Sequence, residues 1–244
     1  MSGPLIAALS GRAIIAPGIA DLRFAMRSPP VLDFRAGQFV SLAVGDGKTE
    51  TGDTLARRSY SIASPSDRGE TLRLILRIIN DGPASRFLMS LPVGADLPMT
   101  GPHGFFMLDA QHAGDIVFAV TGTGIAAVLP MLGELAGHPR TGQRVLYWGL
   151  RHAEDIFSRD EVAELCRRAG VDLHIYLTAP PEGWTGGRGR ITGPILDRFD
   201  SLPTLLAPTF YLVGNGAMIE DLKRQLVSRG VNRKKQIRTE AFFD

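Results

Sequence analysis

Residues 115–127 read DIVFAVTGTGIAA, an apolar run followed by a glycine-rich turn. The apolar run predicts a buried strand, and the residues after the turn predict a helix over Ile125–Leu135. The turn itself is Thr121-Gly122-Thr123-Gly124. A Gly-x-Gly-x-x-Ala turn between a strand and a helix is the context in which backbone N–H groups bind the phosphates of a dinucleotide. We therefore predict a nucleotide-binding α/β domain built around this turn.

The chain after this turn continues to alternate strands and helices. Apolar runs predict strands over Arg144–Trp148, Val171–Leu177 and Thr209–Val213. Ser158 and Glu161 predict a capping box that opens a helix between the first two of these strands. A last helix is predicted by apolar residues that share one helical face, namely Met218, Ile219, Leu222 and Leu226. This alternation favours a parallel sheet covered by helices.

The first part of the chain, residues 20–108, has a different pattern. One helix is expected over Pro83–Leu91, because proline suits a first helical position. Short apolar segments separated by Gly, Pro, Asp and Ser predict strands over Leu22–Met26, Phe39–Val44, Ser59–Ile62, Leu72–Ile79 and Asp96–Met99. Many short strands with a single helix favour an antiparallel β-barrel. A polar break at residues 109–114 divides the chain into a barrel domain, residues 1–110, and an α/β domain, residues 111–244.

The composition narrows the class of protein. The 244 residues include a single cysteine, Cys166, so we expect no internal disulfide, no cysteine-ligated iron–sulfur cluster and no metal site. With 27 basic and 25 acidic residues, binding to nucleic acid is not expected. No apolar run reaches the about 18–20 residues of a membrane helix, and no signal-peptide pattern opens the chain. We therefore expect a cytoplasmic protein with no membrane partner.

Basic residues crowd the C-terminal end of the sequence. They predict either a solvated face or a docking patch for an acidic protein. The five residues are Arg229, Arg233, Lys234, Lys235 and Arg238.

Two motifs in the barrel half carry candidate binding groups. Arg58-Ser59-Tyr60-Ser61, on a predicted strand, combines an arginine fork suited to pyrophosphate with a ring and a hydroxyl that could serve a flavin. Gly82-Pro83-Ala84-Ser85 precedes a helix, where free backbone N–H groups and the Ser85 hydroxyl can bind phosphate. Each motif alone has an ordinary alternative, an exposed strand in the first case and a strand-to-helix turn in the second.

Two more segments belong to the α/β half. Gly214-Asn215-Gly216-Ala217-Met218 is again a turn between a strand and a helix, and Gly214 and Gly216 would let a flat ring approach the backbone. The strand at Arg144–Trp148 is not followed by the acidic residue usual in dinucleotide-binding folds. Gly149-Leu150-Arg151 stands there instead.

With these motifs in view, the chain from about residue 12 to its end resembles the ferredoxin–NADP reductase superfamily. Arg58-x-Tyr60-Ser61 is similar to that family's flavin motif, and Gly82-x-x-Ser85 to its pyrophosphate motif. The Thr121–Gly124 turn is similar to its nicotinamide-nucleotide loop, and Gly214–Met218 to its Cys-Gly-Pro-Pro-x-Met turn. Glu240-Ala241-Phe242 looks like its closing Glu-x-Phe. The resemblance implies an FAD-dependent reductase that takes hydride from NADH or NADPH.

The resemblance also implies roles for single residues. Tyr60 would pack on the flavin, Ser61 would hydrogen-bond flavin N5, and Arg58 would bind the pyrophosphate. Glu240 would be a polar neighbour of the transferring centre, and Phe242 would shield the flavin until nicotinamide enters. Ordinary packing of a C-terminal tail is the alternative for Phe242 and Phe243. The expected catalytic residues are Ser61, Tyr60 and Glu240. The expected cofactor-binding residues are Arg58, Ser59, Tyr60, Ser61, Arg77, Gly82, Ala84, Ser85, Thr121, Gly122, Thr123, Gly124, Arg151, Gly214, Asn215, Gly216, Met218 and Phe242.

Departures from the family pattern bear on the nucleotide. Val213 stands where the family often has Cys, and Asn215-Gly216 replaces Pro-Pro, from which we expect a looser turn. Residues 178–182 read TAPPE and lack the basic pair with which NADPH-preferring members hold the 2′-phosphate, so we expect NADH. Arg151, Arg188 or Arg190 could still reach that phosphate.

The sequence does not identify the electron acceptor. We expect a separate protein, either a ferredoxin, a flavodoxin or an oxygenase component, because the chain lacks cysteines for an iron–sulfur module. A reductase of free flavin is the alternative enzyme, although such relatives tend to have Phe in place of Tyr60. A nucleotide-binding electron-transfer subunit without turnover is the alternative from another class, and Val213 and Asn215 keep it open.

Overall fold

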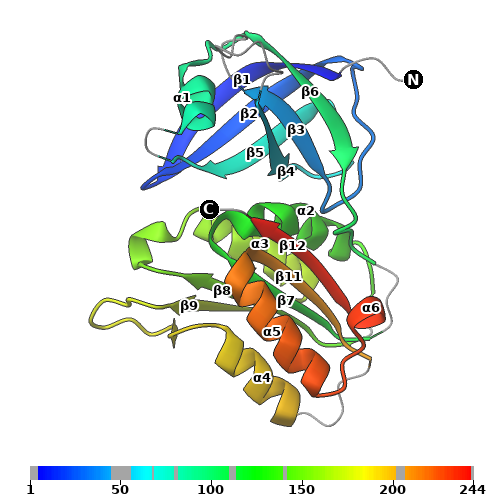
Figure 1. Cartoon of the computed structure of the whole chain (residues 1–244), viewed down its shortest axis with the longest axis vertical. Helices are drawn as coiled ribbons and strands as arrows, with labels where there is room; N and C mark the ends of the chain where they lie inside the picture. Colours follow the sequence, from blue (N-terminus) through cyan, green and yellow to red (C-terminus); the bar gives the residue numbers. More distant parts are fainter. Residues whose placement is uncertain are drawn as a thin grey trace. The chain divides into compact units, whose positions relative to one another are not determined.

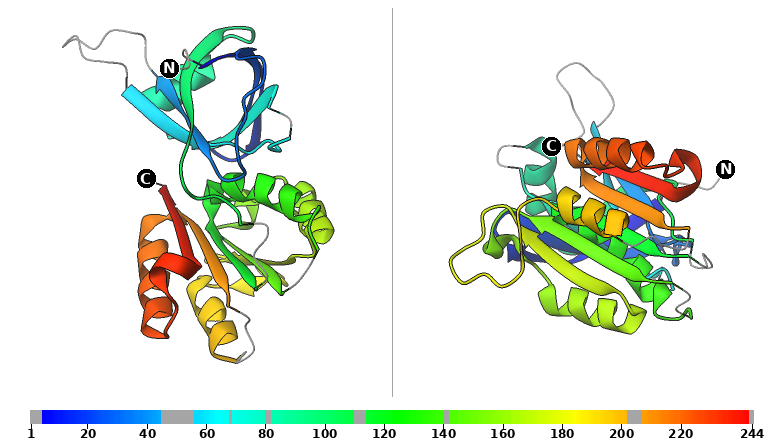
Figure 2. Two further views of the ribbon diagram at one scale, coloured as in Figure 1. Left: turned by 90° about the vertical axis from the view of Figure 1, so that its right-hand side faces the viewer. Right: turned by 90° about the horizontal axis from the view of Figure 1, so that it is seen from below.

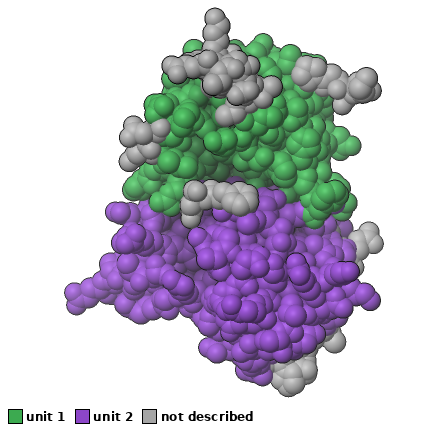
Figure 3. Space-filling view, in the orientation of Figure 1, with its two compact units in different colours: residues 1–105 green, residues 106–244 purple. Residues whose placement is uncertain are grey.

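The computed structural model describes residues 5–44, 56–67, 69–79, 82–109, 114–139, 142–201 and 207–242. The chain divides into two compact units, Met1–Phe105 and Phe106–Asp244, which Figure 3 shows in different colours. The division lies slightly before the domain boundary that we expected at residue 110. The predicted fold class is confirmed: an antiparallel barrel precedes an α/β unit with a parallel sheet.

The first unit is a six-stranded antiparallel barrel in the order β4-β3-β6-β1-β2-β5 (Figure 1). A bridge between Ile62 and Leu74 joins the chain after β4 to β5, at the two ends of this order. The strands are β1 (Leu5–Ala16), β2 (Ile19–Ser28), β3 (Phe39–Val44), β4 (Ala56–Ser61), β5 (Thr71–Arg77) and β6 (Asp96–His103).

β1 is a strand that the sequence analysis missed. The strand begins with buried residues on both faces, including Ala7, Ala8 and Leu9, and ends with an exposed hairpin arm. Neither half alternates apolar and polar residues, so the period-two signal of a half-buried strand is absent.

One helix, α1 (Pro83–Ser90), completes the barrel unit. Pro83 occupies the first turn, as predicted. Leu88 is fully buried in the same core as Leu22, Phe24 and Leu74. Burying one such side chain contributes about 1.5–3 kcal/mol. α1 is therefore fixed against the barrel by its apolar face, which sets the position of its first turn.

The second unit contains a six-stranded parallel sheet in the order β10-β9-β8-β7-β11-β12. Its strands are β7 (Ile116–Thr121), β8 (Arg144–Leu150), β9 (Asp172–Leu177), β10 (Gly187–Arg188), β11 (Thr209–Asn215) and β12 (Ile237–Phe242). Its helices are α2 (Ile125–Leu135), α3 (Arg159–Ala169), α4 (Thr192–Ser201), α5 (Gly216–Ser228) and α6 (Arg233–Gln236), with short 3₁₀ turns at η1 (Gly122–Gly124) and η2 (Ala153–Asp155).

Helices cover both faces of this sheet (Figure 2). α2 packs against α3, and α4 packs against α5. The core beneath α4 and α5 includes Tyr147, Ile195, Leu212 and Leu222. The predicted helical face on α5 is confirmed, because Ile219, Leu222 and Leu226 are buried and Met218 packs against the same core.

In this unit, the predicted capping box was wrong and some helices and strands were not predicted. Ser158 precedes α3 with a left-handed φ of 47°, and its side chain does not accept the capping hydrogen bond that the predicted capping box requires. A capping box forms at η2 instead, where the His152 N–H donates to the Asp155 carboxylate over 2.8 Å. The sequence analysis also did not predict α4 or the strand β12.

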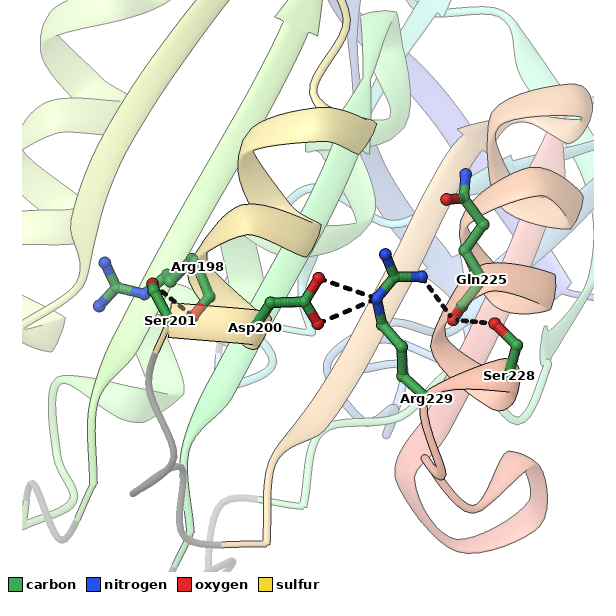
Figure 4. Close-up of polar contacts among 6 residues, drawn as sticks. All are labelled: Arg198, Asp200, Ser201, Gln225, Ser228 and Arg229. Carbon is green, nitrogen blue, oxygen red and sulfur yellow. Dashed lines mark hydrogen bonds and ion pairs between the residues drawn. The ribbon is translucent and has the colours of Figure 1, made fainter.

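Two arginines connect neighbouring helices through side-chain hydrogen bonds. Arg144 is buried and donates to the carbonyls of Leu135 at 3.1 Å and Ala169 at 2.8 Å, the ends of α2 and α3. A cation suits two helix C-termini, where carbonyl oxygens carry partial negative charge. Arg229, after α5, donates to Asp200 on α4 over 3.0 Å (Figure 4). One of the five basic residues near the C-terminus is therefore part of the packing of two helices.

Cys166 generates a prediction about stability at high pH. The thiol is 2% exposed, and burial raises its pKa to about 12. In the unfolded chain a cysteine thiol titrates near about 8.5. Between these two values the unfolded chain has lost a proton that the folded protein keeps, so stability falls as the pH rises, by about 1.4 kcal/mol per pH unit.

We therefore expect the free energy of unfolding of the wild type to fall more steeply from pH 8 to pH 10 than that of Cys166→Ala. Urea titrations of both proteins at each pH measure the two slopes. The comparison uses slopes because removal of a buried side chain lowers stability at every pH. Parallel slopes would show that the thiol titrates normally in the folded protein.

Candidate functional site

The order in which strands are added to the parallel sheet reverses at β7, which is the first of its strands in the sequence. From β7 the chain builds β8 and β9 on one side, and it later returns to place β11 on the other side. A reversal of this kind leaves a crevice outside the carboxyl ends of the two strands that flank it, where α/β folds bind ligands. The Thr121–Gly124 turn follows β7 and the Gly214–Met218 turn follows β11, so both candidate turns lie at this edge.

The two turns contact each other directly. The Asn215 N–H donates to Thr121 Oγ1 over 2.8 Å. Gly214 has a φ of +115°, and a Cβ at this position would lie 2.3 Å from Thr121 Oγ1 and 2.5 Å from the Thr121 carbonyl oxygen. A Cβ on Gly124 would lie 3.0 Å from the Val213 carbonyl oxygen. Gly214 is therefore required by the packing of one turn on the other, and the approach of a flat ring to its backbone stays a prediction.

Gly122 and Gly216 are the open positions of the two turns. Gly122 has a left-handed φ of +54°, and no heavy atom would lie within 4 Å of an added Cβ. The nearest neighbour of a Cβ on Gly216 would be Ala241 Cβ, at 4.0 Å. The Trp148 indole N–H donates to the Gly122 carbonyl oxygen over 3.0 Å, a contact that the sequence analysis did not predict. The backbone before α2 is thus held in place while its outer side stays accessible.

Asn215 caps the helix that follows β11. Its side-chain oxygen accepts a hydrogen bond from the Met218 N–H over 3.0 Å, and α5 begins at Gly216. Asparagine is among the residues preferred at this position, because its oxygen satisfies a free N–H of the first helical turn. The Asn-Gly pair is therefore a capped helix start and not the looser turn that we expected.

The last strand brings two further residues to the same edge. β12 runs parallel to β11, with Glu240 beside Val213 and Phe242 beside Asn215. Both Glu240 and Phe242 are half-buried. Phe243 lies outside the described residues. The closing motif of the sequence and the turn after β11 are therefore neighbours in the sheet.

Arg151 directly follows β8 at this edge of the sheet. Its side chain is exposed, and its carbonyl oxygen accepts a hydrogen bond from the Ala179 N–H over 2.8 Å. In this unit the structure thus gathers the turn after β7 and several other predicted residues at the carboxyl ends of the strands. The others are Arg151, Gly214, Asn215, Gly216, Met218, Glu240 and Phe242.

In the barrel unit, the predicted flavin motif alternates along β4. Arg58 pairs with Leu42, and Tyr60 pairs with Val40, so these two side chains share one face of the strand. The Arg58 guanidinium is exposed and donates to the Arg57 carbonyl oxygen over 2.9 Å. The Tyr60 ring packs against the barrel core, and burial raises the pKa of its hydroxyl although the Arg58 charge opposes this. Tyr60 is therefore neutral at physiological pH.

Ser59 and Ser61 occupy the opposite face of β4. Ser59 is exposed and pairs with Ser41, while Ser61 is 5% exposed and pairs with Phe39. The Ser61 hydroxyl therefore lies in a largely water-excluded environment, where a hydrogen bond is electrostatically stronger than in water.

The predicted phosphate cradle lies at the first turn of α1. Gly82 precedes the helix with an extended backbone and no side chain caps the turn, so the N–H of Ala84 has no partner within the helix. Ser85 is buried, and its hydroxyl oxygen accepts the Ile79 N–H over 2.9 Å. The hydroxyl therefore also holds the chain that leads from Arg77, the exposed last residue of β5, into the helix.

These two barrel motifs are close in the fold, because α1 packs against β3, the strand paired with β4. Among the described residues, no group of three or more His, Cys, Asp or Glu side chains is placed to hold a metal ion. No helix in the described parts of the chain is long and apolar enough to cross a membrane.

Two families of known domains match the chain. Residues 7–108 match the oxidoreductase FAD-binding domain, and residues 118–224 match the oxidoreductase NAD-binding domain. Ferredoxin–NADP reductase B of Sorangium cellulosum is 30% identical over 229 residues, which cover 90% of this chain and 90% of that protein. NADH-cytochrome b5 reductase 1 of Ajellomyces capsulatus is 28% identical over 232 residues, which cover 91% of this chain and 73% of that protein.

A solved structure also resembles the chain over nearly its whole length. The cytochrome P450 reductase GcoB of Amycolatopsis superimposes with a TM-score of 0.83 at 27% sequence identity, covering 98% of this chain and 70% of that one. The three similar proteins are named for three different acceptors, a ferredoxin, a cytochrome b5 and a cytochrome P450.

The contact between the two turns predicts that Gly214 and Gly216 differ in how much stability is lost when each is replaced by alanine. In Gly214→Ala the new methyl group would collide with the backbone and side chain of Thr121, and the backbone would also keep an unfavourable φ. We expect a loss of stability of about 2–4 kcal/mol, measured by urea unfolding. Gly216→Ala is the matched control, because its Cβ meets only ordinary contacts. Equal stability of the two variants would contradict the close packing of the turns.

Proposed function

Because the chain belongs to the ferredoxin–NADP reductase superfamily, we propose that it transfers hydride from NADH or NADPH to a bound FAD and delivers the electrons to a separate protein. The observation that carries the proposal is the pair of glycine turns, joined by the Thr121–Asn215 hydrogen bond at the switch point of the sheet. Residues 7–108 also match an FAD-binding domain, which would bind the second cofactor of such a reaction.

The groups on the barrel fit an FAD. Its pyrophosphate requires cations and N–H donors, and the exposed Arg58 guanidinium and the uncapped first turn of α1 are such donors. FAD supplies the redox chemistry, because it accepts a hydride and can release electrons one at a time.

In this proposal Arg58, Gly82, Ala84 and Ser85 hold the pyrophosphate, while Arg77 and Ser59 add polar contacts around it. The neutral Tyr60 packs its ring on the flavin, and the buried Ser61 hydroxyl donates a hydrogen bond to flavin N5. A fixed donor in a water-excluded place stabilises developing charge without having to reorganise. These two residues would therefore set the orientation in which hydride is received.

The edge of the parallel sheet fits a pyridine nucleotide. The open side of Gly122 and the helix start behind it would bind the pyrophosphate through Thr121, Thr123 and Gly124. Gly216, with open space at its Cβ position, together with Asn215 and Met218, would line the nicotinamide side. Glu240 would be a polar neighbour of the reacting carbon, and Phe242 would cover the flavin until nicotinamide displaces it.

The acceptor in this proposal is a one-electron carrier. Oxidation of one NADH releases two electrons and one proton, so two carrier molecules are each reduced by one electron for every NADH consumed. We propose a ferredoxin, a flavodoxin or an oxygenase component as this carrier. The support is that the similar proteins are named as reductases of a ferredoxin and of two cytochromes.

The role of Ser61 can be tested by its removal. Ser61→Ala should slow reduction of the bound flavin by NADH by about 5- to 30-fold, which corresponds to a lost hydrogen bond of about 1–2 kcal/mol. Stopped-flow absorbance under anaerobic conditions measures the rate, and the flavin content of the purified variant shows that FAD is still bound. Ser90→Ala, on the exposed end of α1, is the control. An unchanged rate in Ser61→Ala would show that the Ser61 hydroxyl does not hydrogen-bond flavin N5.

The preference between the two nucleotides is a second test. Thr178 and Ala179 are exposed after β9 and carry no charge, and the Arg188 side chain donates to the Trp184 carbonyl oxygen over 3.2 Å. Thr178 and Ala179 thus offer no cation to a 2′-phosphate, and desolvating that phosphate without a cationic partner gains nothing, so kcat/KM should favour NADH. We expect a difference of about tenfold, or about 1.4 kcal/mol.

Steady-state kinetics with both nucleotides at one ionic strength measures this preference, since salt screens phosphate contacts. A tenfold preference for NADPH would overturn the expectation. In that case Arg151→Ala and Arg190→Ala would show which guanidinium binds the phosphate.

A further inference from the structure

Trp148 on β8 forms a hydrogen bond with the turn that follows β7. Its side chain is 0% exposed, and its indole N–H donates to the Gly122 carbonyl oxygen over 3.0 Å. A buried indole N–H usually finds an acceptor, and a carbonyl within the sheet would satisfy it equally well. Here the acceptor belongs to the turn for which we propose the pyrophosphate of the pyridine nucleotide. The hydrogen bond therefore joins the core of the sheet to a candidate binding loop.

This hydrogen bond fixes the direction of the peptide group between Gly122 and Thr123. The peptide bond is trans, so its C=O and its N–H point in opposite directions. Because the Gly122 C=O points toward the buried indole, the Thr123 N–H points away from it. The Thr123 N–H is therefore presented on the side of the turn that lies away from Trp148.

The Thr123 N–H is also suited to an anion. Thr123 is the second residue of η1, which leads directly into α2, and the first N–H groups of a helical segment have no acceptor within that segment. Free N–H groups and the partial positive charge of a helix start favour phosphate binding. In the proposed function the phosphate belongs to NADH. Trp148 would therefore orient a donor for the pyrophosphate through the backbone of Gly122.

Nothing in Gly122 itself would hold this peptide group in one direction. Gly122 has a φ of +54°, and no heavy atom lies within 4 Å of the position of an added Cβ. Glycine adopts positive and negative φ about equally readily, so the peptide group could rotate if the indole did not hold it. The hydrogen bond from Asn215 to Thr121 holds the residue before Gly122, not the peptide group after it. A rotated peptide would present its carbonyl oxygen, with its partial negative charge, to the phosphate.

Phe157 packs against the same indole. The two ring centroids lie 5.3 Å apart at an interplanar angle of 82°, and Phe157 is 1% exposed. Phe157 lies between η2 and α3, so it reaches Trp148 from a different segment than the turn does. A phenylalanine ring has no hydrogen-bond donor. A change at Phe157 would therefore remove packing from Trp148 and leave the indole N–H in the protein.

We propose that Trp148 is a positioning residue for the pyridine nucleotide, because its indole N–H holds the Gly122 carbonyl so that the Thr123 N–H points to the pyrophosphate. The inference rests on the proposed function, since the pyrophosphate is that of the hydride donor. Trp148 has no contact with nicotinamide or flavin in this proposal. Loss of its N–H should weaken nucleotide binding and leave the hydride-transfer step unchanged.

The test removes the indole N–H in two ways. Trp148→Phe keeps a buried aromatic ring without a donor. A second protein carries 3-benzothienylalanine at position 148, in which sulfur replaces the N–H in a ring of nearly the same shape, and it serves also if Trp148→Phe does not fold. Phe157→Leu is the matched control, because it removes buried ring atoms beside the indole and keeps the N–H. Urea unfolding measures the stability of each protein.

Two measurements separate binding from hydride transfer. Calorimetry gives the Kd of ADP-ribose, which carries the pyrophosphate but no nicotinamide, without turnover. Anaerobic stopped-flow reduction of the FAD-loaded proteins over a range of NADH concentrations gives the Kd of NADH and the limiting rate of flavin reduction.

Both changes at position 148 should raise the Kd of ADP-ribose and of NADH by about 5- to 30-fold, the scale of one lost hydrogen bond. The limiting rate of flavin reduction should stay at the wild-type value. Phe157→Leu should lose stability but bind both ligands as the wild type does. A general loss of core packing would not produce this difference between the variants.

The positioning role is overturned if the proteins changed at position 148 bind ADP-ribose as tightly as the wild type, or if Phe157→Leu weakens binding to the same extent. A lower limiting rate in the 3-benzothienylalanine protein would also overturn it, because the indole N–H would then act on the hydride step. A wild type that binds no ADP-ribose and whose flavin NADH does not reduce would instead contradict the proposed function. The two failures are distinguishable, because the first appears only in the comparison of variants and the second in the wild type.

Discussion

The hydrogen bond from the Asn215 N–H to Thr121 Oγ1 holds together the two turns on which the α/β unit depends. It forms only because Gly214 has no Cβ, which leaves room for Thr121 within 2.3 Å of where that atom would stand. The same contact fixes the start of α5, whose cap is the Asn215 side chain. Glycine at this position is thus a packing requirement, and the open faces of Gly122 and Gly216 are what remains for a ligand.

The fold class and most helices and strands could be predicted from the sequence. The strand–turn–helix units around Gly122 and Gly214 carry strong local signals, and their order predicts a parallel sheet. β1 was missed because its buried half has no alternating period. β12 was missed because its three consecutive polar residues, Arg238–Glu240, match no strand pattern. The contacts of Thr121 and Trp148 with the neighbouring turn and strand depend on tertiary packing, which no local pattern contains.

The structure also bears on the alternative of a nucleotide-binding subunit without turnover. That alternative depended on Val213 and on an Asn215-Gly216 turn that we expected to be loose. The turn is a capped helix start, so one of these two departures from the family pattern does not disturb the backbone. Val213 is fully buried and its backbone contacts Gly124, so its side chain is part of the sheet core. Both observations favour an ordered nucleotide site, which the reductase and the alternative both require, so turnover is what separates the two.

In the proposed function, one chain passes hydride from a pyridine nucleotide to its own FAD. An anaerobic titration of the flavin-loaded protein with NADH, followed at the flavin absorption band, tests it most directly. The account predicts bleaching that is complete at a stoichiometric amount of NADH, and release of FAD rather than FMN when the protein is then denatured. Binding of NADH without bleaching, or release of FMN, would contradict it.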